Sequence, residues 1–275
     1  MAAGDELMTA AELLWECWQR GTRLAGLPEA IRPRTREEGY AIQEQLERRT
    51  AAPLFGWKIA ATSIAGQKHI NVNGPLAGRL LAERVSTSGA ALPFGANHMR
   101  VAEAEFAFRM GRTLEPRDQP YDVVDVLAAV DTLHPAIEVP DSRYDDFTTV
   151  GAPQLIADNA CAHQFVLGPA TTAPWRDLDL VEYPVTGTVA GKATHQGKGA
   201  NVLGDPRIAL TWLANELSEL GIPLQAGQVV TTGTCIVPLP IEAGDAVAMD
   251  FGVLGRVACS ISNSQLPNPN SQQRA

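Results

Sequence analysis

Two short apolar segments carry the residue types that hold a hard divalent cation. Glu103 and Glu105 lie within residues 101–108, and Glu138 lies within residues 135–139. On a β-strand, alternate side chains share one face, so Glu103 and Glu105 would point the same way. An unpaired carboxylate such as Glu138 is costly inside an apolar strand. Three carboxylates without cysteine or histidine at ligand spacing suit Mg²⁺ or Mn²⁺, which prefer oxygen ligands.

A plainer interpretation of residues 101–108 is a half-exposed strand whose acidic face meets water, because charged residues are mostly exposed. Glu138 favours the metal site instead, since its neighbours in the sequence are apolar. The metal hypothesis requires all three carboxylates to meet within a common sphere of about 4–5 Å.

Strands and a few long helices must position these groups. Short β-branched runs between turn residues predict strands at residues 101–108, 135–139, 164–167, 229–232, 246–251 and 256–261. Strands and helices do not alternate regularly, so the pattern indicates an α+β fold.

Capping signals place the predicted helices. Residues 9–12 and 35–38 have the spacing of capping boxes and predict two helices within the first fifty residues. Asp205 can cap a later helix that ends at Gly221. A weaker helix is predicted over residues 122–132.

The overall composition excludes several classes of protein. The chain of 275 residues has 22 Lys and Arg against 31 Asp and Glu, which gives a formal charge of −9. Nucleic acids and anionic membranes require clustered basic residues, so neither is expected as a partner. No apolar run approaches the roughly 20 residues of a membrane span, and the N-terminus lacks the pattern of a secretory signal. Four scattered cysteines suit a reducing compartment, so we expect a cytoplasmic location.

A series of short motifs, spread over about residues 35–261, resembles a known family. In chain order the motifs are GWKI at 56–59, TS at 62–63, ExE at 103–105, IEVPDSR at 137–143, ADN at 157–159, GANVLGDP at 199–206, WLAN at 212–215, TGT at 232–234 and DFG at 250–252. Their joint order and spacing resemble the 2-keto-4-pentenoate hydratase family of the fumarylacetoacetate hydrolase superfamily. That family also includes 2-oxohept-3-enedioate hydratases and 4-oxalocrotonate decarboxylases.

The resemblance implies a mixed β-sandwich roll with an N-terminal helical region, a Mg²⁺ or Mn²⁺ cofactor and a homo-oligomer. The capping signals and the change of composition after Pro53 divide the chain into a helical region at 1–52 and a metal-binding catalytic β-roll at 53–262. Residues 263–275 are polar and contain two prolines, so a disordered tail is expected there. The resemblance also implies that the three glutamates are the metal ligands.

Further site residues are implied by motif position. Lys58 would sit beside the substrate, where desolvation near a metal lowers the pKa of a lysine enough for proton transfer. Without the resemblance, a surface lysine is the simpler interpretation of Lys58. The loop of Thr232, Gly233 and Thr234 would hold the substrate carboxylate. The alternative interpretation of this loop is a glycine turn that ends a strand.

Other motif residues have open alternatives. Ser63, Asp158 and Arg143 are assigned to substrate binding, although Arg143 could be structural and tied to Asp141. Arg143 is also a candidate to bind a distal carboxylate of a dicarboxylic substrate, because guanidinium groups pair bidentately with carboxylates. The other candidates for that task are Arg79 and Arg100.

One departure from the family affects catalysis. Leu76 stands where most hydratases have an acidic residue, a candidate proton shuttle. His69 could replace it, since histidine titrates near neutrality, or it could be a loop residue without a role. His163 also differs from the smaller residues of relatives; it could touch the substrate, or it could be a hydrogen-bonded core histidine.

The resemblance implies a lyase that adds water to a 2-hydroxy-2,4-dienoate in aromatic-compound breakdown. One alternative is an acylpyruvate C–C hydrolase of the maleylpyruvate or fumarylpyruvate type, and another is a 4-oxalocrotonate-type decarboxylase. A non-catalytic partner subunit is a further alternative, because hydratases and decarboxylases of this family can associate. The expected partners are a small 2-oxo or 2-hydroxy acid and further copies of the chain, with a complex with a pathway neighbour also possible.

Overall fold

Two β-sheets packed against each other organise the chain, which a computed structural model describes over residues 3–264. The larger sheet has the strand order β2-β1-β10-β5-β6-β7-β3, and β11 pairs with one end of β5. Its strands are β1 (Gly56–Ala60), β2 (Leu76–Leu80), β3 (Val85–Thr87), β5 (Val101–Met110), β6 (Val130–Val139), β7 (Gln164–Leu167), β10 (Val229–Thr234) and β11 (Leu239–Pro240).

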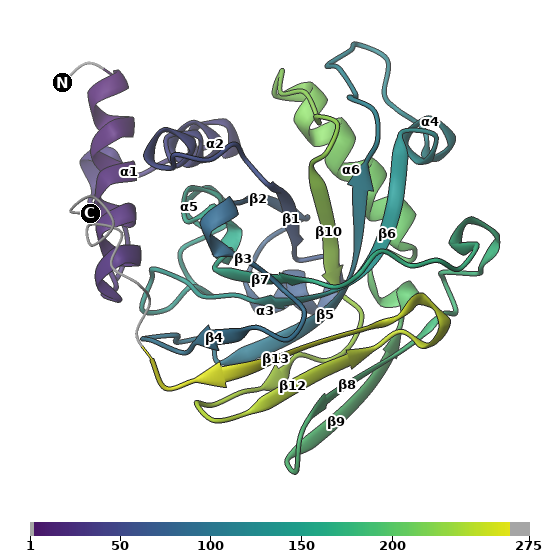
Figure 1. The fold of residues 1–275 in the computed structure, drawn as a ribbon. Helices are drawn as coiled ribbons and strands as arrows, with labels where there is room; N and C mark the ends of the chain where they lie inside the picture. The colour runs from purple at the N-terminus through teal and green to yellow at the C-terminus, as the bar shows by residue number, and fades with distance from the viewer. Residues whose placement is uncertain (1–2, 265–275) are drawn as a thin grey trace.

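The smaller sheet has the order β4-β13-β12-β8-β9 and crosses below the larger one in Figure 1. Its strands are β4 (Ala91–Pro93), β8 (Pro184–Val189), β9 (Ala193–Lys198), β12 (Ala246–Asp250) and β13 (Arg256–Ser262). The core between the sheets includes Phe106 and Phe251, whose rings meet edge to face at 5.1 Å.

Helices cover the larger sheet and one side of the molecule. They are α1 (Ala3–Arg20), α2 (Arg36–Glu44), α3 (Ile64–His69), α4 (Val123–Leu127), α5 (Ala152–Ala157) and α6 (Pro206–Glu219). Short 3-10 turns are found at Glu29–Ile31, Glu47–Arg49, Ala82–Arg84, Asn159–Cys161, Trp175–Asp177, Gly199–Asn201 and Gly252–Leu254. In Figure 1, α1 stands at the side of the molecule, with α2 between it and the sheet.

Most predicted elements are present. Each of the six predicted strands coincides with an observed strand, and the helix after Asp205 is α6, capped by the Asp205 side chain. The Thr35 capping box is formed in both directions at the start of α2. The four cysteines are buried and free, as their scatter predicts. The boundary at residue 52 stays a prediction.

Two local predictions are wrong. Thr9 does not begin a helix, because α1 is already helical from Ala3 and the Thr9 hydroxyl donates to the Asp5 carbonyl inside it. The predicted helix at 122–132 ends at Leu127, because β6 begins at Val130 and pairs with β5. Tertiary strand pairing outweighs local helix preference there.

Residues 265–275, most of the predicted tail, lie outside the described residues. Over residues 3–264, none of the helices combines the length and the apolar character needed to cross a membrane.

Candidate active site

Two neighbouring strands bring the three glutamates together. Glu103 on β5 lies directly opposite Glu138 on β6, and Glu105 is two residues further along β5 on the same face. One carboxylate oxygen from each glutamate lies within 4.8 Å of the other two. The convergence that the metal hypothesis requires is therefore present.

The carboxylates occupy a poorly hydrated environment. Glu105 and Glu138 are buried, whereas Glu103 is partly exposed and lines a cavity. Burial, aided by the charge of a neighbouring glutamate, raises the pKa of Glu103 and of Glu105 to about 7. Burial likewise raises the pKa of Glu138 to about 8, although the ammonium of Lys58 opposes the shift.

Two of these glutamates have oxygens that fit a cation. Among the described residues, Glu105 Oε1 and Glu138 Oε2 are buried without any hydrogen-bond partner. Buried polar atoms are nearly always satisfied, so these oxygens need a ligand. A three-carboxylate set with free oxygens fits a hard divalent ion.

A bulge in β10 holds Glu105 in place. The pairing of β10 with β5 shifts register between Thr231 and Thr234. Within this bulge, the Thr231 hydroxyl and the Gly233 N–H both donate to Glu105 Oε2. Gly233 has a φ of +97°, and a Cβ there would lie 2.1 Å from the Thr62 hydroxyl oxygen. Glycine is therefore required, and the bulge leaves Glu105 Oε1 free.

Lys58 completes the cluster from β1, where it pairs with Thr231 of β10. Its Nζ lies 3.0 Å from Glu138 Oε1 and donates to the Ala160 carbonyl at 3.0 Å. Burial lowers the pKa of Lys58, but the three glutamates outweigh that effect and leave the pKa raised. The predicted lowering of the Lys58 pKa refers to a lysine beside a bound metal and stays a prediction.

A strained turn carries the carbonyl that Lys58 contacts. Asn159, Ala160 and Cys161 are consecutive non-glycine residues with φ of +55°, +49° and +60°. Each such residue costs roughly 1–3 kcal/mol, so the surroundings must enforce the turn. The Asn159 side chain bonds to the Arg79 backbone N–H and carbonyl, and a Cβ at Gly78 would lie 2.4 Å from the Asn159 carbonyl oxygen. The sequence signal for this turn is Asn159, a residue type that tolerates left-handed backbone.

A cavity of about 560 Å³ opens beside the cluster. The predicted site residues that line it are Lys58, Ser63, His69, Glu103, Gly233 and Thr234. Ser63 caps α3 by accepting from the Gly66 N–H at 3.0 Å, and His69 ends the same helix. Ala160 also lines the cavity; neither it nor Thr231 was predicted as a site residue.

Arg143 and Asp158 do not line this cavity; they form a buried ion pair with each other. Asp158 also accepts from the Ser142 hydroxyl at 2.7 Å, and Arg143 donates to the carbonyls of Asp141 and Ala162. These bonds stabilise the loop after β6. The predicted structural contact between Arg143 and Asp141 is present, but Arg143 donates to the Asp141 backbone carbonyl and not to its carboxylate. The geometry therefore speaks against substrate binding by either residue.

Thr232 is also turned away from the cavity. It is completely buried, and its hydroxyl donates to the Phe106 carbonyl at 3.0 Å. It joins β10 to β5 across the bulge, so of the predicted TGT loop only Gly233 and Thr234 face the cavity.

The other two candidate arginines lie elsewhere. Arg79 pairs with Glu47 and stacks on the Trp57 ring, with 4.7 Å between its guanidinium carbon and the ring centroid. Arg100 lies over the Phe94 ring at 5.5 Å. Neither lines the cavity.

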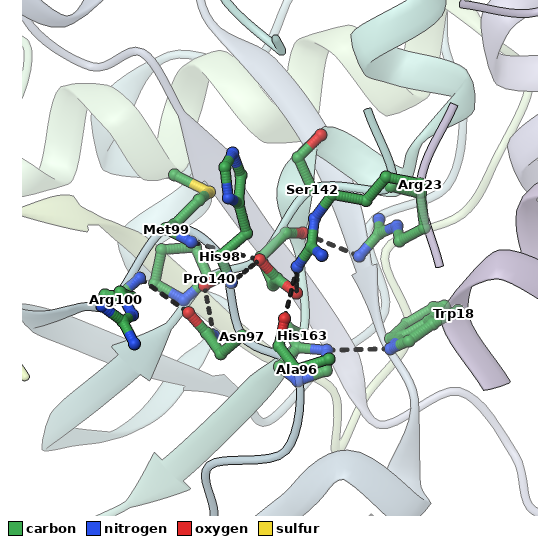
Figure 2. A network of polar contacts seen from close by, with 12 residues as sticks. Trp18, Arg23, Ala96, Asn97, His98, Met99, Arg100, Pro140, Ser142 and His163 are labelled. Carbon is green, nitrogen blue, oxygen red and sulfur yellow. Dashed lines mark hydrogen bonds and ion pairs between the residues drawn. The ribbon is translucent and has the colours of Figure 1, made fainter. Parts of the chain in front are cut away.

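His163 is a core histidine in a polar network around the loop of residues 94–100. Figure 2 shows it accepting a hydrogen bond from the Trp18 indole, at 2.8 Å. Burial lowers its pKa well below the usual range, with help from nearby arginines. The same figure shows the loop's Met99, a cavity residue, within this network. His163 therefore contacts α1 through Trp18 and does not line the cavity.

Comparison with known proteins identifies the family in which this arrangement of residues is found. Residues 37–262 match the family model described as fumarylacetoacetate (FAA) hydrolase C-terminal. The chain belongs to the fumarylacetoacetate hydrolase family. It is 30% identical over 260 residues to a 2-keto-4-pentenoate hydratase of Paraburkholderia xenovorans, covering 94% of this chain and 95% of the relative. It is 33% identical over 258 residues to a 2-hydroxyhexa-2,4-dienoate hydratase of Comamonas testosteroni, covering 92% and 96%.

Within this family, a similar solved structure is 4-oxalocrotonate decarboxylase from Pseudomonas putida G7, complexed with magnesium and adipate. The TM-score is 0.84 at 26% identity, covering 94% of this chain and 97% of the decarboxylase. A second structure of that enzyme holds calcium and acetate, with a TM-score of 0.83. The predicted family and the α+β sandwich roll are thereby confirmed.

One feature of this family member is the apolar side chain of Leu76. Leu76 is fully buried on β2, pairs with Ala60 of β1 and lines the cavity. Along the same strand pair, Gly78 is the partner of Lys58, so Leu76 and Lys58 share one face. An apolar group therefore stands where an acidic proton shuttle was expected.

Proposed function

We propose that this chain is a divalent-metal-dependent hydratase that adds water to a 2-hydroxy-2,4-dienoate in aromatic-compound breakdown. The observation that carries the proposal is the convergence of Glu103, Glu105 and Glu138 beside Lys58, with unpartnered oxygens on Glu105 and Glu138. Relatives named as hydratases, at about a third identity over nearly the whole chain, support it.

The three glutamates would hold Mg²⁺ or Mn²⁺. When bound, such a cation supplies a chelating partner for a 2-oxo acid and stabilises negative charge at its 2-oxygen. The magnesium and calcium complexes of the decarboxylase neighbour support a divalent ion and leave the choice between Mg²⁺ and Mn²⁺ to experiment.

The chain's own groups orient the substrate and move protons. Lys58 holds a proton on Nζ, beside Glu138 and at the wall of the cavity, so it is placed to pass that proton to a substrate carbon. The Ser63 hydroxyl accepts from Gly66 and keeps its own proton for a substrate oxygen. Gly233 and Thr234 line the cavity, but the Gly233 N–H donates to Glu105 and the Thr234 hydroxyl donates to the Ile236 carbonyl, so carboxylate binding by this loop stays a prediction.

His69 is the proposed second proton carrier. It lines the cavity at the end of α3, and its ring packs edge-on against Phe147 at 6.0 Å. Leu76 cannot exchange a proton, so a histidine at this wall is the available group for moving protons to and from water.

Turnover of freshly generated 2-hydroxypenta-2,4-dienoate tests the proposal. Its ultraviolet decay and the product mass should show a product one water heavier, formed only with Mg²⁺ or Mn²⁺. Glu105→Gln should abolish the reaction, while Glu115→Gln, a change on an exposed loop, should leave it intact. Absence of metal-dependent hydration in freshly folded protein would refute the hydratase assignment.

Similarity to 4-oxalocrotonate decarboxylase supports a second candidate activity of the same site, the decarboxylation of a 4-oxalocrotonate-type acid. The product mass separates the possibilities, since decarboxylation removes carbon dioxide and acylpyruvate hydrolysis gives two fragments. Binding of metal and oxalate without any turnover would favour the non-catalytic partner subunit. The homo-oligomer, the association with a pathway neighbour and the cytoplasmic location stay predictions.

A further inference from the structure

The cavity has two chemically different parts. One part presents Lys58 and Glu103. The remainder has an apolar wall, contributed by the end of α3, by β2, by α5 and by the segments after β6 and β10. The wall residues are Ile70, Leu76, Phe147, Leu155, Ile236 and Val237.

Polar side chains near the wall already have backbone partners. Asn201 donates from its amide to the Cys235 carbonyl at 2.6 Å, and the Thr234 hydroxyl donates to the Ile236 carbonyl at 2.9 Å. The Ser63 oxygen accepts from a backbone N–H. These bonds hold the loops in position and turn the donors of Asn201 and Thr234 away from a bound molecule.

The chain's candidate partners for a second carboxylate are engaged elsewhere. Arg79 pairs with Glu47, Arg143 pairs with Asp158, and Arg100 lies on Phe94. Lys58 is the lysine that lines the cavity among the described residues, and Glu138 already pairs with it. His69, the proposed proton carrier, lies against Phe147 at one end of the wall. A carboxylate buried against the rest of the apolar wall would lose its hydration without gaining a partner.

The volume of the cavity is also larger than the smallest 2-hydroxydienoate substrate needs. At about 30 Å³ per non-hydrogen atom, the share of a water molecule in the liquid, its volume of about 560 Å³ accommodates roughly 19 atoms. A five-carbon 2-hydroxydienoate has eight such atoms, so most of the apolar part would stay unfilled.

We propose that the preferred substrate is a 2-hydroxy-2,4-dienoate whose C5 carries an uncharged apolar group of several carbons. This rests on the proposed hydratase function and narrows it. Each methylene buried against the wall raises binding about fourfold. A second carboxylate at that position is rejected, which distinguishes this chain from enzymes that act on dicarboxylic acids.

The test compares two substrates of the same shape. 2-Hydroxy-6-methylhepta-2,4-dienoate ends in an isopropyl group, and 2-hydroxyhexa-2,4-dienedioate ends in a carboxylate of similar size. With Mg²⁺, kcat/KM should be at least 100-fold higher for the isopropyl compound than for the diacid, and about 60-fold higher than for 2-hydroxypenta-2,4-dienoate, because three carbons are added. Equal or faster hydration of the diacid would overturn the inference while leaving the hydratase function intact.

A binding measurement decides the inference even if no dienoate is hydrated. With Mg²⁺ present, 2-oxo-6-methylheptanoate should raise the melting temperature more than 2-oxohexanedioate at equal concentration, because only the bound native state is stabilised. The reverse order would contradict an apolar-substituent pocket. Failure of turnover with the expected binding order would refute the hydratase function alone.

Two exposed valines provide a matched pair of variants. Val237 lines the cavity and is 69% exposed, whereas Val253 is 70% exposed and lies outside its lining. Val237→Lys should raise the diacid-to-isopropyl ratio of kcat/KM about 10-fold by offering a cation. Val253→Lys should leave the ratio unchanged. An unchanged ratio in Val237→Lys, in a variant with normal melting temperature, would show that the substituent does not contact this wall and would overturn the assignment.

Discussion

The molecule has two buried ionic clusters, the Arg143–Asp158 pair and the Lys58–glutamate cluster, and they differ in how completely they are hydrogen bonded. In the Arg143–Asp158 pair, both carboxylate oxygens and all three guanidinium nitrogens have partners. In the Lys58–glutamate cluster, Glu105 Oε1 and Glu138 Oε2 have none among the described residues. The first cluster is complete without a ligand, and the second is not.

The difference separates a structural brace from a binding site. Arg143 and Glu138 belong to the same IEVPDSR motif, so the motif alone does not distinguish their roles. The saturation of their hydrogen bonds distinguishes them, because an unsatisfied buried charge persists only where something else compensates it. Stability should therefore depend on the first cluster, and ligand binding on the second.

The largest effect is expected from Arg143→Met. It leaves Asp158 as an uncompensated buried charge, which should cost about 3–5 kcal/mol of unfolding free energy. Urea unfolding of the chelator-treated protein measures this loss. The double variant Arg143→Met/Asp158→Leu should recover part of the stability. A loss below about 1 kcal/mol for the single variant would remove the distinction between the clusters.

Glu138→Gln should affect the binding of Mg²⁺ more than the stability of the metal-free protein. In chelator, its unfolding free energy should fall by less than the roughly 3–5 kcal/mol expected for Arg143→Met, because the change removes the ion-pair partner of Lys58 but also a like charge next to Glu103 and Glu105. Mg²⁺ at about 100 times its dissociation constant should stabilise the wild type by about 2.7 kcal/mol and leave the variant unaffected. The comparison of melting curves with and without Mg²⁺ checks both statements. A Mg²⁺ response retained in the variant would exclude Glu138 as a ligand.

The pH dependence of stability sharpens the same contrast. The pKa values of about 7 for Glu103 and Glu105 and about 8 for Glu138 exceed the ordinary value of 4.5. A carboxyl group with a raised folded-state pKa favours the folded state below that pKa, so the chelated protein should lose stability from about pH 5 to pH 8.

Metal binding requires the deprotonated carboxylates and should reverse this trend. The stabilisation by Mg²⁺ should therefore grow below neutrality by about 1.4 kcal/mol per pH unit for each proton released, and up to about three protons leave the three glutamates. Denaturation at pH 5.5, 6.5 and 7.5 with matched ionic strength measures it. A Mg²⁺ effect independent of pH would argue against ligation by protonatable carboxylates.

The smallest effect is expected at the strained turn between the clusters. Asn159→Ala removes the side-chain bonds to Arg79 and places alanine at a φ of +55°, so it should cost about 1–2 kcal/mol. Displacement of the Ala160 carbonyl from Lys58 should lower kcat about 10-fold with little change in KM. Asn159→Gly, which tolerates the backbone angle, should restore part of the stability but not kcat. Full activity in both variants would show that the turn does not position Lys58.

The parts of the molecule that sequence could predict are those set by local periodicity. The shared face of Glu103 and Glu105 follows from strand alternation, and the Asp205 cap follows from local turn chemistry. The pairing of Arg143 with Asp158 could not be predicted, because the partner of a long side chain depends on which loop packs against it; its assignment to the substrate stays a prediction. The raised pKa of Lys58 also required the structure, since it results from three charges on two other strands.

Elements buried by distant contacts were the hardest to predict. β1 and β2 contain glycines at positions where another backbone approaches closely, and such strands have weak local signals. Thr231 has an ordinary strand sequence, and only the bulge reveals that its hydroxyl holds Glu105.

The position of β10 in the larger sheet has a consequence for how the protein is made. β10 lies between β1 and β5, although it follows them in the chain by more than a hundred residues. Such non-local pairings form slowly during folding, because a long loop must close first. During synthesis, Lys58 and the glutamates leave the ribosome well before Thr231 and Gly233 can anchor Glu105. A nascent chain should thus acquire metal affinity only when β10 inserts, so metal capture marks the completion of the fold.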